Sequence, residues 1–90
     1  MTKIEKDIKI KNRLGLHARA AAQFVKTANR YNCEVKVSKD HTTANGKSIM
    51  GVLTLAASLG SIIRISCTGH DAEEAMLDLE KLIEEKFKEE

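Results

Sequence analysis

The residues best suited to chemistry in this sequence are a histidine and an arginine at the junction of two predicted elements. His17 follows the strand-like segment 4–10 and precedes an alanine-rich run that is typical of a helix starting at Ala18. The first N–H groups of a helix have no partner within the helix and point outward. With the helix dipole and the guanidinium of Arg19, they predict a site for an anion of phosphate size that contains a nucleophilic imidazole.

A lone histidine at a helix start is more often structural than chemical. Here its neighbours Gly15, Ala18 and Ala20 are small, so we expect the imidazole to stay exposed rather than be packed away. The pair His17 and Arg19 is therefore predicted to carry a phosphoryl group, because an arginine offers a planar fork of donors to phosphate oxygens.

The remaining pattern supplies the elements that must position this pair. Alternating apolar and polar residues predict strands over 4–10, 33–38 and 63–67. A turn candidate over 39–41 predicts that residues 42–44 return as a further short strand. Helical spacing predicts a helix over 18–30, a second from Ile49 ending near Gly60, and a third from Ala72 to the C-terminus. The apolar face expected for the first helix consists of Ala18, Ala21, Ala22, Val25 and Ala28, with Phe24 at its border. Asp71 with the glutamates that follow resembles a capping box at the start of the third helix.

This order, β-α-β-β-α-β-α, predicts an α+β open-faced β-sandwich. In this fold class a four-stranded, mainly antiparallel sheet is covered on one side by three helices. We expect one domain over residues 1–90, since this length is enough for one small core.

The composition limits the class of partner. Residues 1–70 carry twelve basic and four acidic side chains, whereas residues 71–90 carry three basic and nine acidic ones. A basic body favours anionic ligands or acidic partners, and the acidic last helix is expected to present a solvated face. A small RNA-binding module is the alternative, but aromatic residues make up only 3% of the chain, which leaves no stacking platform. We therefore expect that the protein does not bind nucleic acid.

Membrane, metal and cofactor chemistry are not indicated. No apolar run is long enough to span a bilayer and the N-terminal residues lack a signal-peptide core, so a cytoplasmic protein is expected. Cys33 and Cys67 are then expected to be buried thiols rather than a disulfide. They and the histidines show no metal-ligand spacing, so we expect no metal and no cofactor.

A second motif, Gly46-Lys47-Ser48, superficially resembles the end of a phosphate-binding P-loop. That motif requires glycine at position 41, where this chain has His41. Ser48 is instead predicted to be the N-cap of the helix that starts at Ile49. This helix cannot bury all its apolar residues on one side, because Ile49, Met50 and Leu53 cluster away from Val52 and Leu55.

The segments Leu14-Gly15-Leu16-His17-Ala18-Arg19-Ala20-Ala21 and Lys47-Ser48-Ile49-Met50-Gly51-Val52 together resemble the HPr family, the histidine-containing phosphocarriers of the bacterial sugar phosphotransferase system. The resemblance covers essentially the whole chain. It implies that His17 accepts a phosphoryl group on Nδ1 from Enzyme I, which phosphoenolpyruvate charges, and passes it to IIA domains of sugar permeases. Arg19 would assist the transfer. The protein would be a carrier and not an enzyme.

The resemblance also assigns roles to the second motif. Ser48 matches a serine that HPr kinase/phosphorylase phosphorylates in some bacteria, and Ile49, Met50 and Leu53 match the surface that docks Enzyme I and IIA. A monomer is expected. One departure is Ala20, where the family usually has proline; alanine still permits the helix to start. The alternative is a regulatory or nitrogen-branch HPr-like protein that acts mainly by binding partner proteins.

Overall fold

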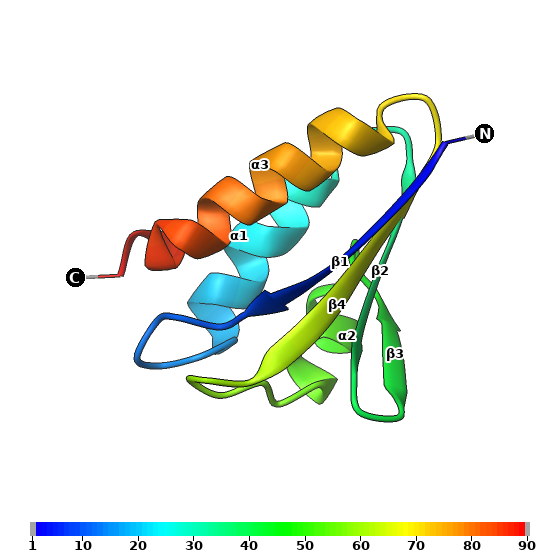
Figure 1. Cartoon of the computed structure of the whole chain (residues 1–90). Helices are drawn as coiled ribbons and strands as arrows, with labels where there is room; N and C mark the ends of the chain where they lie inside the picture. The colour runs from blue at the N-terminus through cyan, green and yellow to red at the C-terminus, as the bar shows by residue number, and fades with distance from the viewer. Residues whose placement is uncertain (1, 90) are drawn as a thin grey trace.

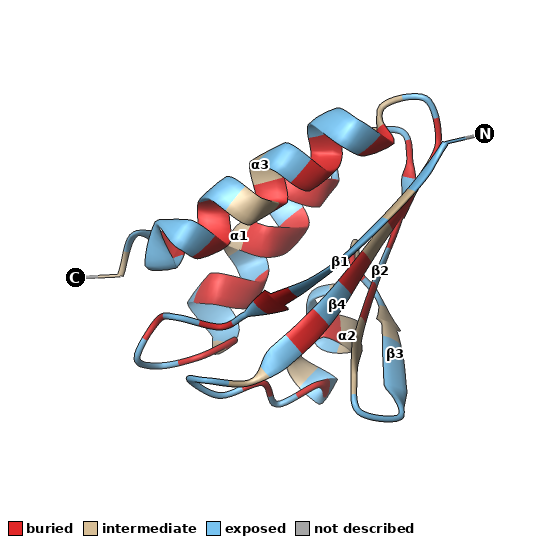
Figure 2. Cartoon of the chain, in the orientation of Figure 1, coloured by how far each residue is buried: buried red, intermediate tan, exposed pale blue. Residues whose placement is uncertain are grey.

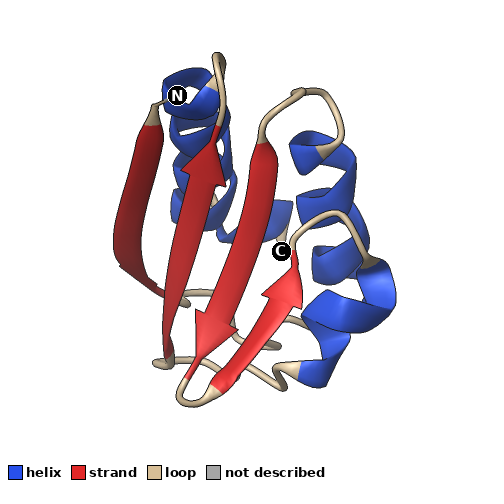
Figure 3. Ribbon diagram, turned by 90° about the vertical axis from the view of Figure 1, so that its right-hand side faces the viewer, coloured by secondary structure: helices blue, strands red, loops and turns tan. Residues whose placement is uncertain are grey.

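Four strands form one sheet, and the helices cover only one of its faces (Figure 1). The computed structural model describes residues 2–89, so Met1 and Glu90, the ends of the predicted domain 1–90, lie outside the described residues. Figure 3 shows the strands in front and the helices behind them. The order of the elements confirms the predicted α+β open-faced sandwich. The strands are β1 (Lys3–Lys9), β2 (Glu34–Lys39), β3 (Thr42–Asn45) and β4 (Ile62–Thr68), and the helices are α1 (Ala18–Ala28), α2 (Ile49–Thr54) and α3 (Ala72–Glu84), followed by a short 3-10 turn over Lys86–Lys88.

The sheet has the order β1-β4-β2-β3, and every neighbouring pair is antiparallel. Ile8 lies opposite Ile63 between β1 and β4, so the end of β1 meets the start of β4. Beyond the strands this pairing continues through the loops: Ile10 N–H donates to Ser61 O at 2.8 Å, and Gly60 N–H donates to Ile10 O at 2.9 Å. The two loops that follow β1 and precede β4 are thereby held side by side.

The core lies between the inner face of the sheet and the helices, where Figure 2 shows the buried residues of α1 and α3 turned toward the strands. Alternation along each strand sends one set of side chains inward and leaves the other in water. The largest side chains with less than 2% exposure include Phe24, Ile10, Ile63, Ile65, Met76, Leu79, Ile83, Val35, Val37 and Val52.

Helix α1 is rotated relative to the predicted face and is two residues shorter than expected. Ala18 and Ala22 are exposed, whereas Ala20 and Phe24 are completely buried. The rotation follows from side-chain size, because burying a phenyl ring removes far more apolar surface from water than burying a methyl group.

Helix α2 ends at Thr54, and the predicted extension toward Gly60 is wrong. Beyond it the chain turns at Ala56, whose φ is +48°, while Leu55 and Ala57 are buried. The carbonyl of Ala57 accepts the N–H of Leu16 at 2.8 Å. This segment therefore pairs with the loop that precedes α1 instead of continuing the helix.

The predicted capping box at Asp71 is also wrong. Asp71 is the N-cap residue of α3, but its side chain makes no cap hydrogen bond. Its carboxylate accepts the backbone N–H groups of Asn32 at 2.8 Å and Cys33 at 2.9 Å, and the bond from Asn32 is the main reason that the pKa of Asp71 is lowered. The side chain thus ties the start of α3 to the connection between α1 and β2.

The acidic side of α3 was predicted to be a solvated face, but two of its glutamates form ion pairs with other parts of the chain. Glu80 pairs with Lys6 at 2.8 Å, and Glu84 pairs with Lys11 at 2.6 Å. Such exposed pairs stabilise a fold only slightly. They show, however, that α3 lies against the basic part of the chain.

Helix α3 ends at Glu84 and does not continue to the C-terminus as predicted.

Candidate functional site

The loop before α1 fixes where His17 lies. Gly15 has φ of +67°, and a Cβ added there would lie 2.4 Å from the carbonyl oxygen of Ala57. Only glycine fits such a close backbone approach with that conformation. Leu16 is buried and its N–H is bonded to Ala57, so the chain enters α1 from a fixed direction.

His17 is the N-cap residue of α1, with extended backbone at φ −77° and ψ 179°. Its carbonyl accepts the first helical hydrogen bond, from Ala21 N–H at 2.8 Å, and its imidazole makes no capping bond. The N–H groups of Ala18, Arg19 and Ala20 have no hydrogen-bond acceptor among residues 2–89. These donors and the helix dipole make the start of α1 suited to an anion.

His17 and Arg19 border one hollow of about 320 Å³. Leu14 and Ala20 line it from the same loop and helix, and the segment Phe87–Glu89 closes its other side. The His17 side chain is 31% exposed, and Arg19 forms none of the ion pairs within residues 2–89. The structure thus brings together the predicted nucleophile, an available guanidinium and the helix N-terminus.

Two residues of this site were not found from the sequence. Asn12 is completely buried, and its Nδ2 donates to Gly15 O at 2.7 Å and to Glu89 Oε2 at 2.9 Å. Glu89 also accepts the N–H of Leu14 at 3.3 Å, and its Oε2 lies 3.8 Å from Nε2 of His17. The hydrogen bond from Asn12 is the main cause of a lowered pKa for the Glu89 carboxyl.

The sequence offers a signal for Asn12 but none for Glu89. Asn12 is the first residue of a turn that ends at Gly15, whose N–H donates to Asn12 O at 3.2 Å, and asparagine is favoured at that turn position. Nothing in the local sequence connects Glu89 with His17, because the contact depends on where the chain turns after α3.

The second motif forms a structural junction between β3 and α2. Ser48 is the N-cap of α2 as predicted, and its Oγ accepts Gly51 N–H at 3.0 Å. Lys47 Nζ donates to the carbonyl of Tyr31 at 2.6 Å, just beyond the end of α1. Lys47 is therefore engaged in holding α1 next to this junction.

The apolar residues of α2 divide as predicted. Ile49 and Met50 are 43% and 72% exposed and Leu53 is partly buried, whereas Val52 and Leu55 are buried. We call Ile49, Met50 and Leu53 the α2 patch. Because α2 packs against α1, the patch belongs to the same helical layer as the start of α1.

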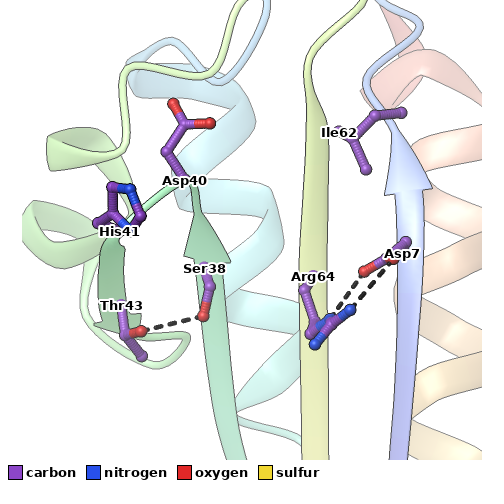
Figure 4. A pocket seen from close by; sticks show the side chains of 7 residues that line it. All are labelled: Asp7, Ser38, Asp40, His41, Thr43, Ile62 and Arg64. Carbon is purple, nitrogen blue, oxygen red and sulfur yellow. Dashed lines mark hydrogen bonds and ion pairs between the residues drawn. The ribbon is translucent and has the colours of Figure 1, made fainter.

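A larger hollow, of about 430 Å³, lies on the outer side of the sheet (Figure 4). Two pairs form among its polar groups: Arg64 Nε donates to Asp7 Oδ1 at 2.8 Å, and the hydroxyls of Ser38 and Thr43 are 3.1 Å apart. Arg64 also lowers the pKa of Asp7 through its hydrogen bond. Asp40 and His41 also line the hollow.

Other predicted features can be placed directly. Cys33 and Cys67 are buried, and burial raises the pKa of the Cys67 thiol to about 12. No group of three or more potential metal ligands occurs in residues 2–89. Within the same residues, no helix is long and apolar enough to cross a membrane.

Comparison with known proteins agrees with this geometry. The family described as "PTS HPr component phosphorylation site" matches residues 4–85. The phosphocarrier protein HPr of Neisseria meningitidis serogroup A is 46% identical over 80 residues, which cover 89% of this chain and 90% of the relative. A crystal structure of HPr from Thermoanaerobacter tengcongensis superposes with a TM-score of 0.93 at 48% identity, covering 97% of this chain and 98% of that one. Crh of Bacillus subtilis, described as the catabolite repression HPr, has a TM-score of 0.66 at 36% identity, covering 89% and 95%.

The chain belongs to the HPr family. It is a phosphocarrier of the phosphotransferase system, which carries a phosphoryl group without being an enzyme.

Proposed function

We propose that His17 accepts the phosphoryl group on Nδ1 from Enzyme I, which phosphoenolpyruvate charges, and passes it to IIA domains of sugar permeases. The observation that carries this proposal is the position of His17 as N-cap of an α1 whose first N–H groups are unpaired, with Arg19 at the same hollow. The carrier acts as one domain over residues 1–90, as a monomer in the cytoplasm, and needs no cofactor.

The site suits a transferring phosphoryl group for electrostatic reasons. Negative charge is spread over the phosphoryl oxygens during transfer, so fixed donors that need no reorganisation stabilise the transition state. The N–H groups of Ala18, Arg19 and Ala20 supply such donors. The guanidinium of Arg19 adds a charge-assisted pair of hydrogen bonds when a phosphoryl group is present.

Ser48 is proposed as a regulatory phosphorylation site for HPr kinase/phosphorylase. Its Oγ already lies at the start of α2, where the N–H of Gly51 donates to it, and a helix N-terminus tolerates phosphate. The added negative charge would weaken docking of an acidic Enzyme I.

The α2 patch is proposed as the surface that docks Enzyme I and IIA domains. Exposed apolar residues that cluster on one side of a helix are typical of partner surfaces. A partner that contacts both the α2 patch and the hollow at His17 would exclude water from the hollow, so that the phosphoryl group moves between side chains instead of being hydrolysed.

A regulatory or nitrogen-branch role is the second candidate, favoured by the likeness to Crh. In that role the protein acts mainly by binding partners. The presence of His17 and Arg19 at one anion site favours the carrier role, because a protein that acts only by binding partner proteins requires neither residue.

The first prediction concerns the acceptor. With Enzyme I and labelled phosphoenolpyruvate, the protein should gain an acid-labile phosphate that His17→Ala lacks and the exposed-histidine control His70→Ala retains. Arg19→Ala should take up label roughly 10- to 100-fold more slowly, as expected for the loss of charge-assisted hydrogen bonds of about 1.5–3 kcal/mol. Undiminished acid-labile labelling of His17→Ala would contradict the assignment.

The second prediction concerns Ser48. Incubation with HPr kinase and ATP should give an acid-stable phosphate on the parent protein and on Ser58→Ala, but not on Ser48→Ala. Because Ser48 caps α2, the Ser48→Ala variant should also lose about 1 kcal/mol of unfolding free energy in urea. Equal labelling of both variants would exclude Ser48 as the site.

The third prediction concerns the α2 patch. Met50→Glu should raise the KM of Enzyme I for this protein roughly ten-fold or more, the effect of losing a docking contact of about 1.4 kcal/mol. Leu77→Glu is the matched control, because Leu77 is similarly exposed, at 65% against 72%, but lies on α3. Similar KM values for the two variants would place docking elsewhere.

A further inference from the structure

We propose that Glu89 is a positioning residue for His17: its carboxylate holds the proton of the neutral imidazole on Nε2 and so leaves Nδ1 free as the nucleophile. The observation behind this is the 3.8 Å separation between Glu89 Oε2 and His17 Nε2. This inference rests on the proposed transfer through Nδ1 of His17.

The Glu89 carboxylate is itself held in place. Oε2 accepts a hydrogen bond from Nδ2 of Asn12 at 2.9 Å, and Asn12 is completely buried. The N–H of Leu14 donates to the same carboxylate, at 3.3 Å to Oε1. Since the Asn12 amide nitrogen also donates to Gly15 O, the carboxylate is joined to the loop that fixes His17.

The backbone after α3 is shaped to bring Glu89 there. The backbone turns here through Lys86, Phe87 and Lys88, whose φ values are +56°, +54° and +57°. Residues other than glycine rarely adopt this left-handed region. Phe87 is 3% exposed and packs in the core. The buried ring anchors this unfavourable turn, and the turn directs the chain back to the loop before α1. Strained backbone of this kind is often found at functional sites.

The carboxylate and the helix N-terminus do not compete for the same donors. Glu89 uses the N–H of Leu14, which precedes His17, whereas the unpaired N–H groups of Ala18, Arg19 and Ala20 follow it. An incoming phosphoryl group therefore has the start of α1 available while Glu89 keeps its contacts.

The chemistry favours one tautomer. A neutral imidazole carries one N–H, and a carboxylate next to one ring nitrogen favours the proton there and the lone pair on the other. The lone pair of Nδ1 then forms the bond to phosphorus as the bond between phosphorus and the donor's leaving atom breaks, and that atom keeps the electron pair. The proton stays on Nε2 of His17, and the positive charge that the ring gains lies next to the Glu89 carboxylate.

The test compares Glu89→Gln with the control Glu85→Gln, which removes a carboxylate from an exposed position at the end of α3. Glutamine can still accept from Asn12 and Leu14, so the charge is removed with little change in shape. In ¹⁵N-labelled, unphosphorylated protein above neutral pH, long-range ¹H–¹⁵N spectra report the fraction of His17 with its proton on Nε2.

We expect that fraction to dominate in the parent protein and in Glu85→Gln, and to fall in Glu89→Gln. Uptake of the phosphoryl group from Enzyme I should fall roughly ten-fold in Glu89→Gln, the low end of the loss seen when the carboxylate partner of a metal-bound histidine is removed. Glu89→Asp, which keeps the charge, should recover part of both effects. An unchanged tautomer ratio and uptake rate in Glu89→Gln would overturn the proposal.

The tautomer ratio is measured without any phosphate. It therefore decides the role of Glu89 even if His17→Ala still took up an acid-labile label, the result that would instead remove the proposed acceptor.

Discussion

The constraint on which the rest of the structure depends is the unpaired N-terminus of α1 next to a histidine. Helix N–H groups without partners are costly to bury and favourable to place beside an anion. Here the loop before α1 keeps them at the surface. Gly15 allows that loop to approach the backbone of Ala57, and Leu16 anchors it there. The antiparallel pairing of β1 with β4 brings the loop that follows β1 and the loop that precedes β4 to the same end of the sheet.

The other elements support this arrangement from different sides. Lys47 holds the junction before α2 to the end of α1, and Asp71 holds the start of α3 to the connection that follows α1. Helix α1 is thus tied to its neighbours at the end remote from His17. The start of α1 is held by contacts of the preceding loop and by the segment that contains Glu89. The polar groups of the site therefore come from two separate parts of the chain, residues 12–20 and Glu89.

Much of the fold could be predicted from the sequence, because local patterns determine it. Alternation identified β1, β2 and β4, the turn candidate over 39–41 identified β3, and Ser48 identified the start of α2. The failures have tertiary causes. The face of α1 was misjudged because Phe24 outweighs several alanines in burial, and α2 was predicted too long because its last residues pair with a loop distant in sequence. The carboxylate of Asp71 was assigned to its own helix, although it bonds the backbone of Asn32 and Cys33.

The site shows the same division. His17 and Arg19 were identified from their spacing at a strand-to-helix junction, where the chemistry follows from local geometry. Glu89 could not be identified, since a single glutamate in an acidic segment carries no sign of its partner. Its contact depends on the left-handed turn over Lys86–Lys88 and on the burial of Phe87. Both are properties of the packed protein and not of the local pattern.

The most direct test of the anion site is the change in amide proton chemical shifts when Enzyme I and phosphoenolpyruvate phosphorylate the ¹⁵N-labelled protein. If the phosphoryl group on His17 is seated by the start of α1, the amide protons of Ala18, Arg19 and Ala20 should move downfield as they donate to it, with small changes in the sheet. Shifts concentrated elsewhere, with these three amides unmoved, would contradict that site.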